Sequence, residues 1–166
     1  MNAVSPMFSR LEKVVLDPES MTALSPYIEA DREQAIADLT AENHFTPLLH
    51  GAAAGPFVLH LSIREGRLVF DIRDRDDQPL FAIGLALGPF RRLVKDYQLL
   101  VDSHIKAVQE GREARIQAID MGRRGLHNEG ADLMRQRLAG KVEIDFDTAR
   151  RLFTLVCVLH QKVSAR

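Results

Sequence analysis

The stretch FRRLVKDYQLLVDSHIKAV, residues 90–108, decides the fold of this 166-residue chain. Residues suited to a buried face recur in it at intervals of three and four: Phe90, Leu93, Val94, Tyr97, Leu100, Val101, His104, Ile105 and Val108. This spacing places them on one face of an α-helix, and no other regular structure fits it over such a length. We therefore predict an amphipathic helix here, against which the segments on either side pack.

The segment before this helix, residues 57–87, predicts a three-stranded antiparallel meander. In FVLHLSI (57–63) and LVFDIRD (68–74) every second residue is apolar, as in a strand with one buried face. Glu65-Gly66 suits a tight turn because glycine accepts a positive φ, and DRDDQP (74–79) suits a second turn. The third run, LFAIGLAL (80–87), is apolar on both faces, so we expect it to be central or covered by a helix.

The first 56 residues predict a short strand, a helix and a loop. LEKVVL (11–16) is rich in β-branched residues and stops at Asp17-Pro18, which favours a strand. Ser25 and Pro26 suit the N-cap and first position of a helix that runs to about Asn43. We expect residues 1–9 to be frayed, and HFTPLLHGAAAGP (44–56), with two prolines and two glycines, to be a mobile surface loop.

The segment after the central helix is mostly helical. Between residues 113 and 139 the apolar pattern is interrupted by Gly122, Gly125 and Gly130. Each internal glycine costs about 1 kcal/mol relative to alanine, so we expect a helix–turn–helix. KVEI (141–144) suits a short strand, and Asp145 suits the cap of a last helix. The run LFTLVCVL (152–159) is apolar nearly all round and predicts burial on several sides.

These elements predict a single α+β domain over residues 1–166. We expect a small antiparallel sheet, formed by the meander and short edge strands, with one face covered by amphipathic helices. The covering helices are chiefly those at 90–110 and 147–160.

Composition favours a cytoplasmic protein. Hydrophobic residues make up 46% and charged residues 27% of the chain, as in ordinary globular domains. No apolar run approaches the about 20 residues that span a bilayer, and the N-terminus lacks a secretory signal. The single Cys157 cannot form an internal disulfide, and its apolar surroundings in the sequence predict a buried thiol.

Charge is distributed unevenly along the chain. Residues 1–88 carry seven Lys and Arg against thirteen Asp and Glu, net −6, whereas residues 89–166 carry fifteen against ten, net +5. The basic half can form a surface for an anionic partner, or the two halves can neutralise each other across their interface. The total of −1 favours the second interpretation.

Four segments, in order along the chain, resemble an uncharacterised alphaproteobacterial protein family of unknown function. They are FDIRD (70–74), PFRRLVKDY (89–97), AIDMGRRGLHNEGA (118–131) and FDTARRLFTLVCVLH (146–160). The likeness extends from about Asp31 to His160. It implies a small cytoplasmic bacterial protein, and it assigns no activity, ligand or catalytic residue.

The densest polar cluster lies at residues 120–130. We take as candidates for anion binding Arg123, Arg124, His127, Asn128 and Glu129. Arginine offers a planar fork that matches phosphate or carboxylate, and nearby glycines let the backbone approach. His127 and Glu129 can supply acid–base chemistry if their side chains converge. The alternative is a structural turn in which these residues form caps and salt bridges with the acidic half.

Arg91 and Arg92 are further anion-binding candidates. They stand at the start of the central helix, where cations are disfavoured by about 0.3–1 kcal/mol each. A carboxylate or a bound anion can offset this cost. We predict that one of them pairs with the acidic segment Asp71–Asp77.

The sequence offers no cofactor or catalytic motif, so whether the chain is an enzyme stays open. No histidine has the spacing of a zinc motif and there is no cysteine pair, so we expect no metal. His104 and His160 fall at apolar positions and suggest core residues with hydrogen-bonded rings. The absence of tryptophan and of a stacking platform argues against nucleic acid.

Two functional hypotheses follow, with a third as a minority interpretation. The first is a non-enzymatic interaction or adaptor protein with a protein partner or a second copy of itself. The second is an enzyme or sensor that binds a phosphorylated or carboxylated small molecule at Arg123–Glu129. The third is RNA binding by the basic C-terminal half.

Overall fold

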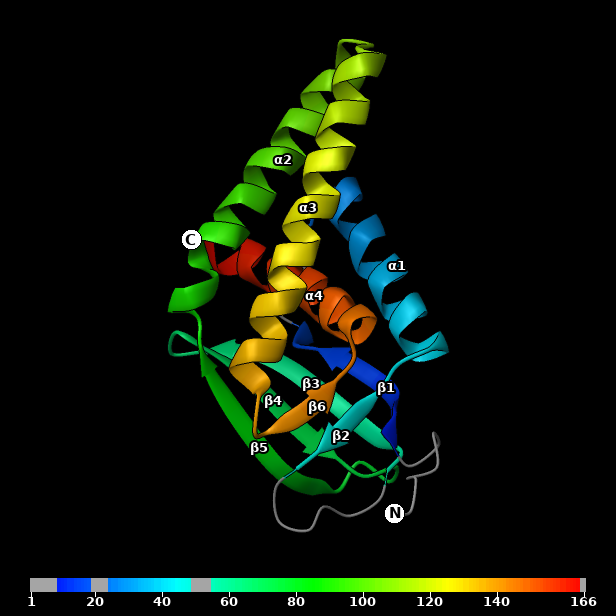
Figure 1. Ribbon diagram of the computed structural model, residues 1–166, viewed down its shortest axis with the longest axis vertical. Helices are drawn as coiled ribbons and strands as arrows, with labels where there is room; N and C mark the ends of the chain where they lie inside the picture. Colours follow the sequence, from blue (N-terminus) through cyan, green and yellow to red (C-terminus); the bar gives the residue numbers. More distant parts are fainter. Residues whose placement is uncertain (1–8, 19–23, 49–54, 165–166) are drawn as a thin grey trace.

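The computed structural model describes residues 9–18, 24–48 and 55–164. The elements in chain order are β1 (Leu11–Leu16), α1 (Pro26–Ala41), β2 (Phe45–Pro47), β3 (Phe57–Arg64), β4 (Arg67–Arg73), β5 (Pro79–Ala86), the 3₁₀ turn η3 (Gly88–Phe90), α2 (Arg91–Gln109), α3 (Glu113–Leu138), β6 (Val142–Ile144) and α4 (Phe146–Ser164). The helices lie on one side of the sheets, and the α2–α3 hairpin extends well beyond them (Figure 1). The α+β class predicted from the sequence is confirmed. Residues 1–8 of the expected frayed end lie outside the described residues.

The meander is confirmed, but the complete sheet is mixed rather than antiparallel. The strand order is β1-β3-β4-β5, and β3, β4 and β5 are antiparallel neighbours. Strand β1 pairs with β3 in parallel. Parallel neighbours need a long crossover connection, and the chain between them contains α1. Ser25 caps α1 as predicted, with its hydroxyl oxygen accepting from the amide of Ile28 at 3.3 Å.

Strand β5 is an edge strand, which corrects the expectation of a central or helix-covered position. Ile83 and Leu85 face the core, whereas Ala82, Gly84 and Ala86 are exposed. The exposed positions are small rather than polar, and this made the segment look apolar on both faces.

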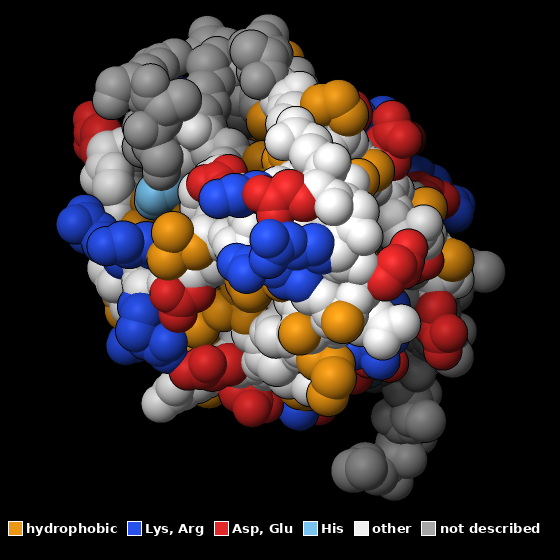
Figure 2. All heavy atoms as spheres, turned by 90° about the horizontal axis from the view of Figure 1, so that it is seen from above, with side chains coloured by type: hydrophobic (Ala, Val, Ile, Leu, Met, Phe, Trp, Pro, Cys, Tyr) orange, Lys and Arg blue, Asp and Glu red, His pale blue; other side chains and the backbone are white. Residues whose placement is uncertain are grey.

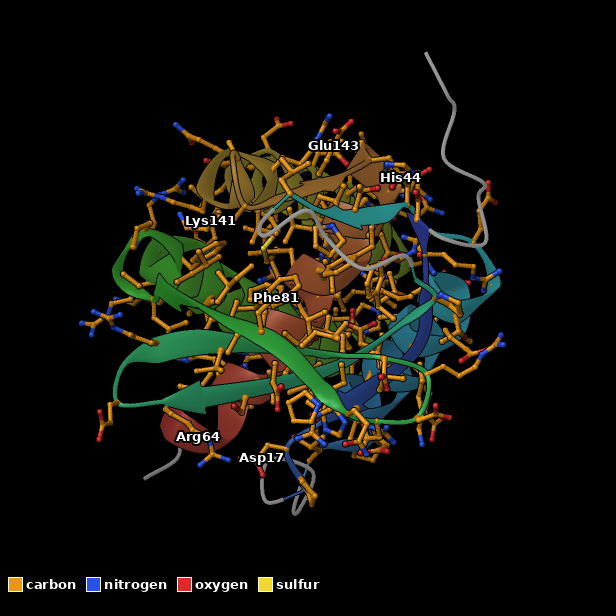
Figure 3. The ribbon with its side chains drawn as sticks, turned by 90° about the horizontal axis from the view of Figure 1, so that it is seen from below. Asp17, His44, Arg64, Phe81, Lys141 and Glu143 are labelled. Atoms are coloured by element: carbon orange, nitrogen blue, oxygen red, sulfur yellow. The ribbon has the colours of Figure 1, made fainter. Side chains whose placement is uncertain are left out.

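The expectation of a mobile loop at residues 44–56 is wrong at its start. Phe45–Pro47 forms β2, which pairs antiparallel with β6 in a second sheet of two strands. Phe45 is fully buried, and the His44 amide donates to the Thr148 hydroxyl oxygen at 2.9 Å. The strand predicted at KVEI is thus confirmed, while residues 49–54 lie outside the described residues. Figure 3 shows the two sheets from below, with Phe81 between them and His44 and Glu143 on the smaller one.

Helix α4 is the centre of the core. Between Leu152 and Leu159 no residue is more than 9% exposed, and the helix contacts α1, α2, α3 and β3. Its start is capped as predicted, since the Asp145 carboxylate accepts from the Thr148 amide at 2.9 Å. Burial of Leu, Val and Phe side chains stabilises a fold by about 1.5–3 kcal/mol each. Cys157 is a fully buried thiol, as expected.

Helix α3 is continuous, so the predicted helix–turn–helix at residues 113–139 is wrong. Gly122, Gly125 and Gly130 all lie inside this one helix. At Gly130 a Cβ atom would overlap the ring of Phe153 in α4. The glycine therefore allows close approach of two helices rather than a turn.

The stripe predicted on α2 is buried over its first three turns only. Leu93, Val94, Tyr97 and Val101 are at most 3% exposed, whereas Val108 is 54% exposed. His104 and Ile105 are still half-buried, and the His104 ring packs against Tyr27 of α1. Val108 lies near the end of α2, where the hairpin extends beyond the rest of the fold and leaves no core for the stripe to cover (Figure 1).

Candidate functional site

A pocket of about 250 Å³ lies among three helices that are far apart in the sequence. Its lining is Asp31, Gln34, Ala35 and Asp38 from α1, Arg123, Arg124 and His127 from α3, and Arg150, Arg151 and Thr154 from α4. We call it the α1–α3–α4 pocket. Three of the residues predicted from the sequence, Arg123, Arg124 and His127, share this site.

The other candidates on α3 lie elsewhere because the segment is helical. Residues two apart on a helix point about 200° apart. Glu129 accordingly lines a groove between α2 and α3 and pairs with Arg92. His127 and Glu129 do not converge, so the acid–base pair suggested by the sequence is not formed. The Asn128 side-chain oxygen accepts from Nε of Arg150 at 3.2 Å, which places it beside the pocket.

The predicted pairing of Arg91 or Arg92 with Asp71–Asp77 is wrong. Arg92 instead contacts Asp96, at 3.2 Å, and Glu129. Asp71 and Asp77 both pair with Arg73 of their own hairpin. The reason is topological: α2 begins where β5 ends, and the acidic turn precedes β5, so a strand of about 25 Å separates them.

Arg123 lines the pocket from α3 and is held in place by contacts with α1. One guanidinium nitrogen donates to the Tyr27 hydroxyl at 2.6 Å and to Asp31 at 3.1 Å. The guanidinium also lies 5.6 Å from the centre of the Tyr27 ring, a cation–π arrangement. The second oxygen of Asp31 accepts from the Tyr97 hydroxyl at 2.7 Å. Burial, together with the charge of Asp31, raises the pKa of both tyrosines, so both stay protonated at neutral pH.

A second ion pair crosses the pocket at Arg151. Its Nε lies 3.4 Å from Asp38, and the other oxygen of Asp38 accepts from Gln34 at 2.9 Å. Asp31 and Asp38 belong to the acidic half of the chain and Arg123 and Arg151 to the basic half. The expected neutralisation between halves thus occurs here, at two of the four pocket arginines.

The pocket nevertheless keeps an excess of positive charge. Four arginines face two carboxylates, and neither Arg124 nor Arg150 has a carboxylate partner within 4 Å among the described residues. Burial and then the charge of Arg151 lower the pKa of Arg150 below its ordinary value. Asp147 acts on Arg150 in the opposite sense but does not line the pocket. An anion placed between these arginines would relieve the repulsion.

His127 lines the pocket as an uncharged, buried side chain. Its ring is 6% exposed and lies edge-on to the rings of Tyr97 and Phe153. Burial, followed by the charges of the pocket arginines, lowers its pKa to about 3. Nδ1 lies 3.2 Å from the Thr154 hydroxyl, which itself donates to the Arg150 carbonyl. The hydroxyl has one proton for these two neighbours, so when it donates to the carbonyl, Nδ1 of His127 must carry a proton to donate to Thr154.

Helices α1 and α4 were not part of the candidate site predicted from the sequence. Tyr27, Asp31, Gln34 and Asp38 recur at intervals of three and four, which marks a polar stripe on one helix face. Arg150 and Thr154 are likewise four apart. The signal was present as periodicity of polar rather than apolar residues, but it did not indicate which helices meet.

His104 differs from the expectation for its ring. Nδ1 of His104 is buried without a hydrogen-bond partner among the described residues, which corrects the expected hydrogen-bonded ring. That ring packs against Tyr27 at 4.8 Å. In the described part of the chain no group of three His, Cys, Asp or Glu is arranged to hold a metal ion. No described helix is long and apolar enough to cross a membrane.

Comparisons with known proteins identify relatives but no activity. The model of an uncharacterised protein family, UPF0262, matches residues 8–162. A UPF0262 protein of Granulibacter bethesdensis is 67% identical over 93% of this chain and 91% of its own length. A UPF0262 protein of Acidiphilium cryptum is 62% identical over 92% and 93%, and one of Rhodopseudomonas palustris is 52% identical over 93% of both. No solved structure matches the chain.

Proposed function

The chain belongs to the uncharacterised protein family UPF0262, and we propose that it binds a small phosphorylated or carboxylated molecule in the α1–α3–α4 pocket. The observation that carries this proposal is the charge imbalance of the pocket, four arginines against two carboxylates. With His127 neutral, the excess is two positive charges. A phosphate monoester carries about −1.5 to −2 at pH 7 and a dicarboxylate −2, so either neutralises it.

The geometry supports binding rather than acid–base catalysis. The depressed pKa of His127 makes it a weak base, and its Nδ1 is committed to Thr154. The pocket volume, about 250 Å³, lies just below the 300–1,000 Å³ of typical ligand sites. This favours a metabolite of few atoms over a dinucleotide. We propose a ligand-sensing protein of the cytoplasm, a placement that suits its single, fully buried cysteine.

Thermal-shift measurements with a defined anion panel test the proposal. The probes are inorganic phosphate, pyrophosphate, a phosphate monoester and citrate, with sodium chloride at equal ionic strength as the reference. We expect at least one probe to raise the melting temperature in proportion to the logarithm of its concentration. Phosphate and citrate arms separate the two ligand chemistries.

The matched variants are Arg150→Gln and Arg137→Gln. Arg150 lines the pocket, whereas Arg137 is exposed on α3 and does not. We expect Arg150→Gln to weaken binding about tenfold or more, since hydrogen bonds between charged groups contribute about 1.5–3 kcal/mol. Arg137→Gln should bind as the wild type does. No shift with any anion, or equal shifts in both variants, would contradict the proposal.

A further inference from the structure

The α2–α3 hairpin exposes an apolar groove on the side away from the α1–α3–α4 pocket. The groove has a volume of about 380 Å³ and is lined by Asp96, Leu99, Leu100, Gly122, Leu126 and Glu129. Leu99 is 56% exposed, and Met121, next to Gly122 on α3, is 74% exposed. Met121 does not line the groove but lies about 100° further round α3 from Gly122, so it borders this surface. Exposed large apolar side chains beside a groove mark an interaction surface.

Two glycines of this face have no packing role that the described part of the chain explains. A glycine inside a helix destabilises it relative to alanine. At Gly130 the ring of Phe153 requires it, but at Gly125 a Cβ would meet none of the described residues within 4 Å. At Gly122 a Cβ would reach only Leu100, at an ordinary contact distance of 3.5 Å. Both glycines leave a smooth helix surface that a second helix can approach closely.

The charges along the same face are self-complementary. Arg115, Gly122 and Glu129 are spaced seven apart, so they lie on one line along α3. Along this line the charge is positive at Arg115, zero at Gly122 and negative at Glu129. When a second α3 lies antiparallel across Gly122, each Arg115 faces the Glu129 of the other copy, twice by symmetry. Glu129 already contacts Arg92, and a carboxylate has enough lone pairs to accept from two arginines.

We propose that this face binds a second copy of the chain, α3 antiparallel to α3, in a two-fold symmetric dimer. Met121, beside the symmetry axis, covers the apolar groove of the other copy. A single self-complementary patch is what a two-fold interface requires. Figure 2 looks from above onto the end of the α2–α3 hairpin rather than onto this face, and shows a surface that mixes apolar, acidic and basic side chains. The proposal is independent of the ligand pocket, which lies on another side of α3.

Sedimentation equilibrium of the full chain tests the dimer. We expect the wild type to dimerise reversibly, and Met121→Lys to weaken the dimer at least tenfold. Val108→Lys is the matched control, because Val108 is 54% exposed on the same hairpin but lies nine residues from Leu99, on the opposite side of α2. It should leave the dimer unchanged. Circular dichroism melting checks that both variants fold.

A charge exchange identifies the antiparallel register. Arg115→Glu and Glu129→Arg should each place like charges opposite each other and prevent dimerisation. An equimolar mixture of the two variants should form a heterodimer, because each Glu then faces an Arg. Three results would overturn the proposal. The first is a wild type that is monomeric at 1 mM, roughly the weakest useful affinity. The others are a dimer whose affinity Met121→Lys leaves unchanged and a mixture of the two variants that stays monomeric.

Discussion

Glycine has different surroundings on the two sides of helix α3. On the side toward α1 and α4, Gly130 fits against Phe153 and Arg123 is held by Tyr27 and Asp31. On the outer side, a Cβ at Gly125 would meet no other described residue within 4 Å, and Met121 is 74% exposed. The comparison shows that the role of a glycine or an arginine can be assigned only once the residues that surround it are known. Each prediction below alters a residue of this helix or one that contacts it.

The largest effect is expected for Gly130→Ala. The new methyl group overlaps the ring of Phe153, which is fully buried. Overpacking of this kind destabilises a core by up to about 3 kcal/mol. Urea denaturation measures the loss. A variant as stable as the wild type would show that α3 and α4 do not pack this closely.

Asp31→Ala should destabilise the fold by about 2–3 kcal/mol. The change leaves the buried Tyr97 hydroxyl without its acceptor and removes the carboxylate that pairs with Arg123. The matched control is Asp96→Ala, whose partner Arg92 is 65% exposed, and which should cost about 0.5 kcal/mol or less. Equal losses of stability in the two variants would show that Asp31 stabilises the fold no more than an exposed carboxylate does.

Acid should destabilise the protein through His127. Its pKa falls from 6.5 to about 3 on folding, so the unfolded chain binds a proton that the folded chain rejects. Stability is therefore full above pH 6.5 and falls as the pH drops toward 3. Between pH 7 and pH 5 this histidine contributes a loss of about 1–2 kcal/mol.

The variant His127→Gln isolates this contribution. Its free energy of unfolding should change less between pH 7 and pH 5 than that of the wild type, by the amount that His127 contributes. Parallel pH profiles for the two proteins would mean that His127 titrates normally.

Gly125→Ala should have the smallest effect, and one of opposite sign. Alanine is the better helix former and its methyl group meets open space, so the monomer gains about 0.5–1 kcal/mol. The measurement is made at concentrations too low for association. A loss of stability would mean that the outer side of α3 is covered within the chain itself.

Local patterns in the sequence predicted the elements better than their neighbours. The stripe on α2, the alternation in β3 and β4 and the apolar run of α4 are local signals, and each element formed where expected. The glycines of α3 were misread as a turn because Phe153, the reason for Gly130, lies 23 residues away in the sequence. Strand β2 was missed because its partner β6 is nearly a hundred residues distant.

The candidate site shows the same limit. Arg123, Arg124 and His127 stood out as a dense local cluster, and all three line the pocket. Asn128 and Glu129 belonged to that cluster in sequence, but the helix turns Glu129 toward the groove. Asp31 and Asp38, which determine how much positive charge remains, come from α1, which nothing in the sequence connected with this cluster. Charge balance in a pocket depends on tertiary contacts, and spacing along one segment does not report it.

Nuclear magnetic resonance of the arginine Nε–H groups tests the central claim most directly. On titration with a phosphate monoester at constant ionic strength, the signals of Arg124 and Arg150 should shift together and saturate, while that of Arg137 stays in place. Such a result would place a bound anion between the unpaired arginines of the α1–α3–α4 pocket. Shifts of equal size at all arginines, or none at Arg150, would contradict the account.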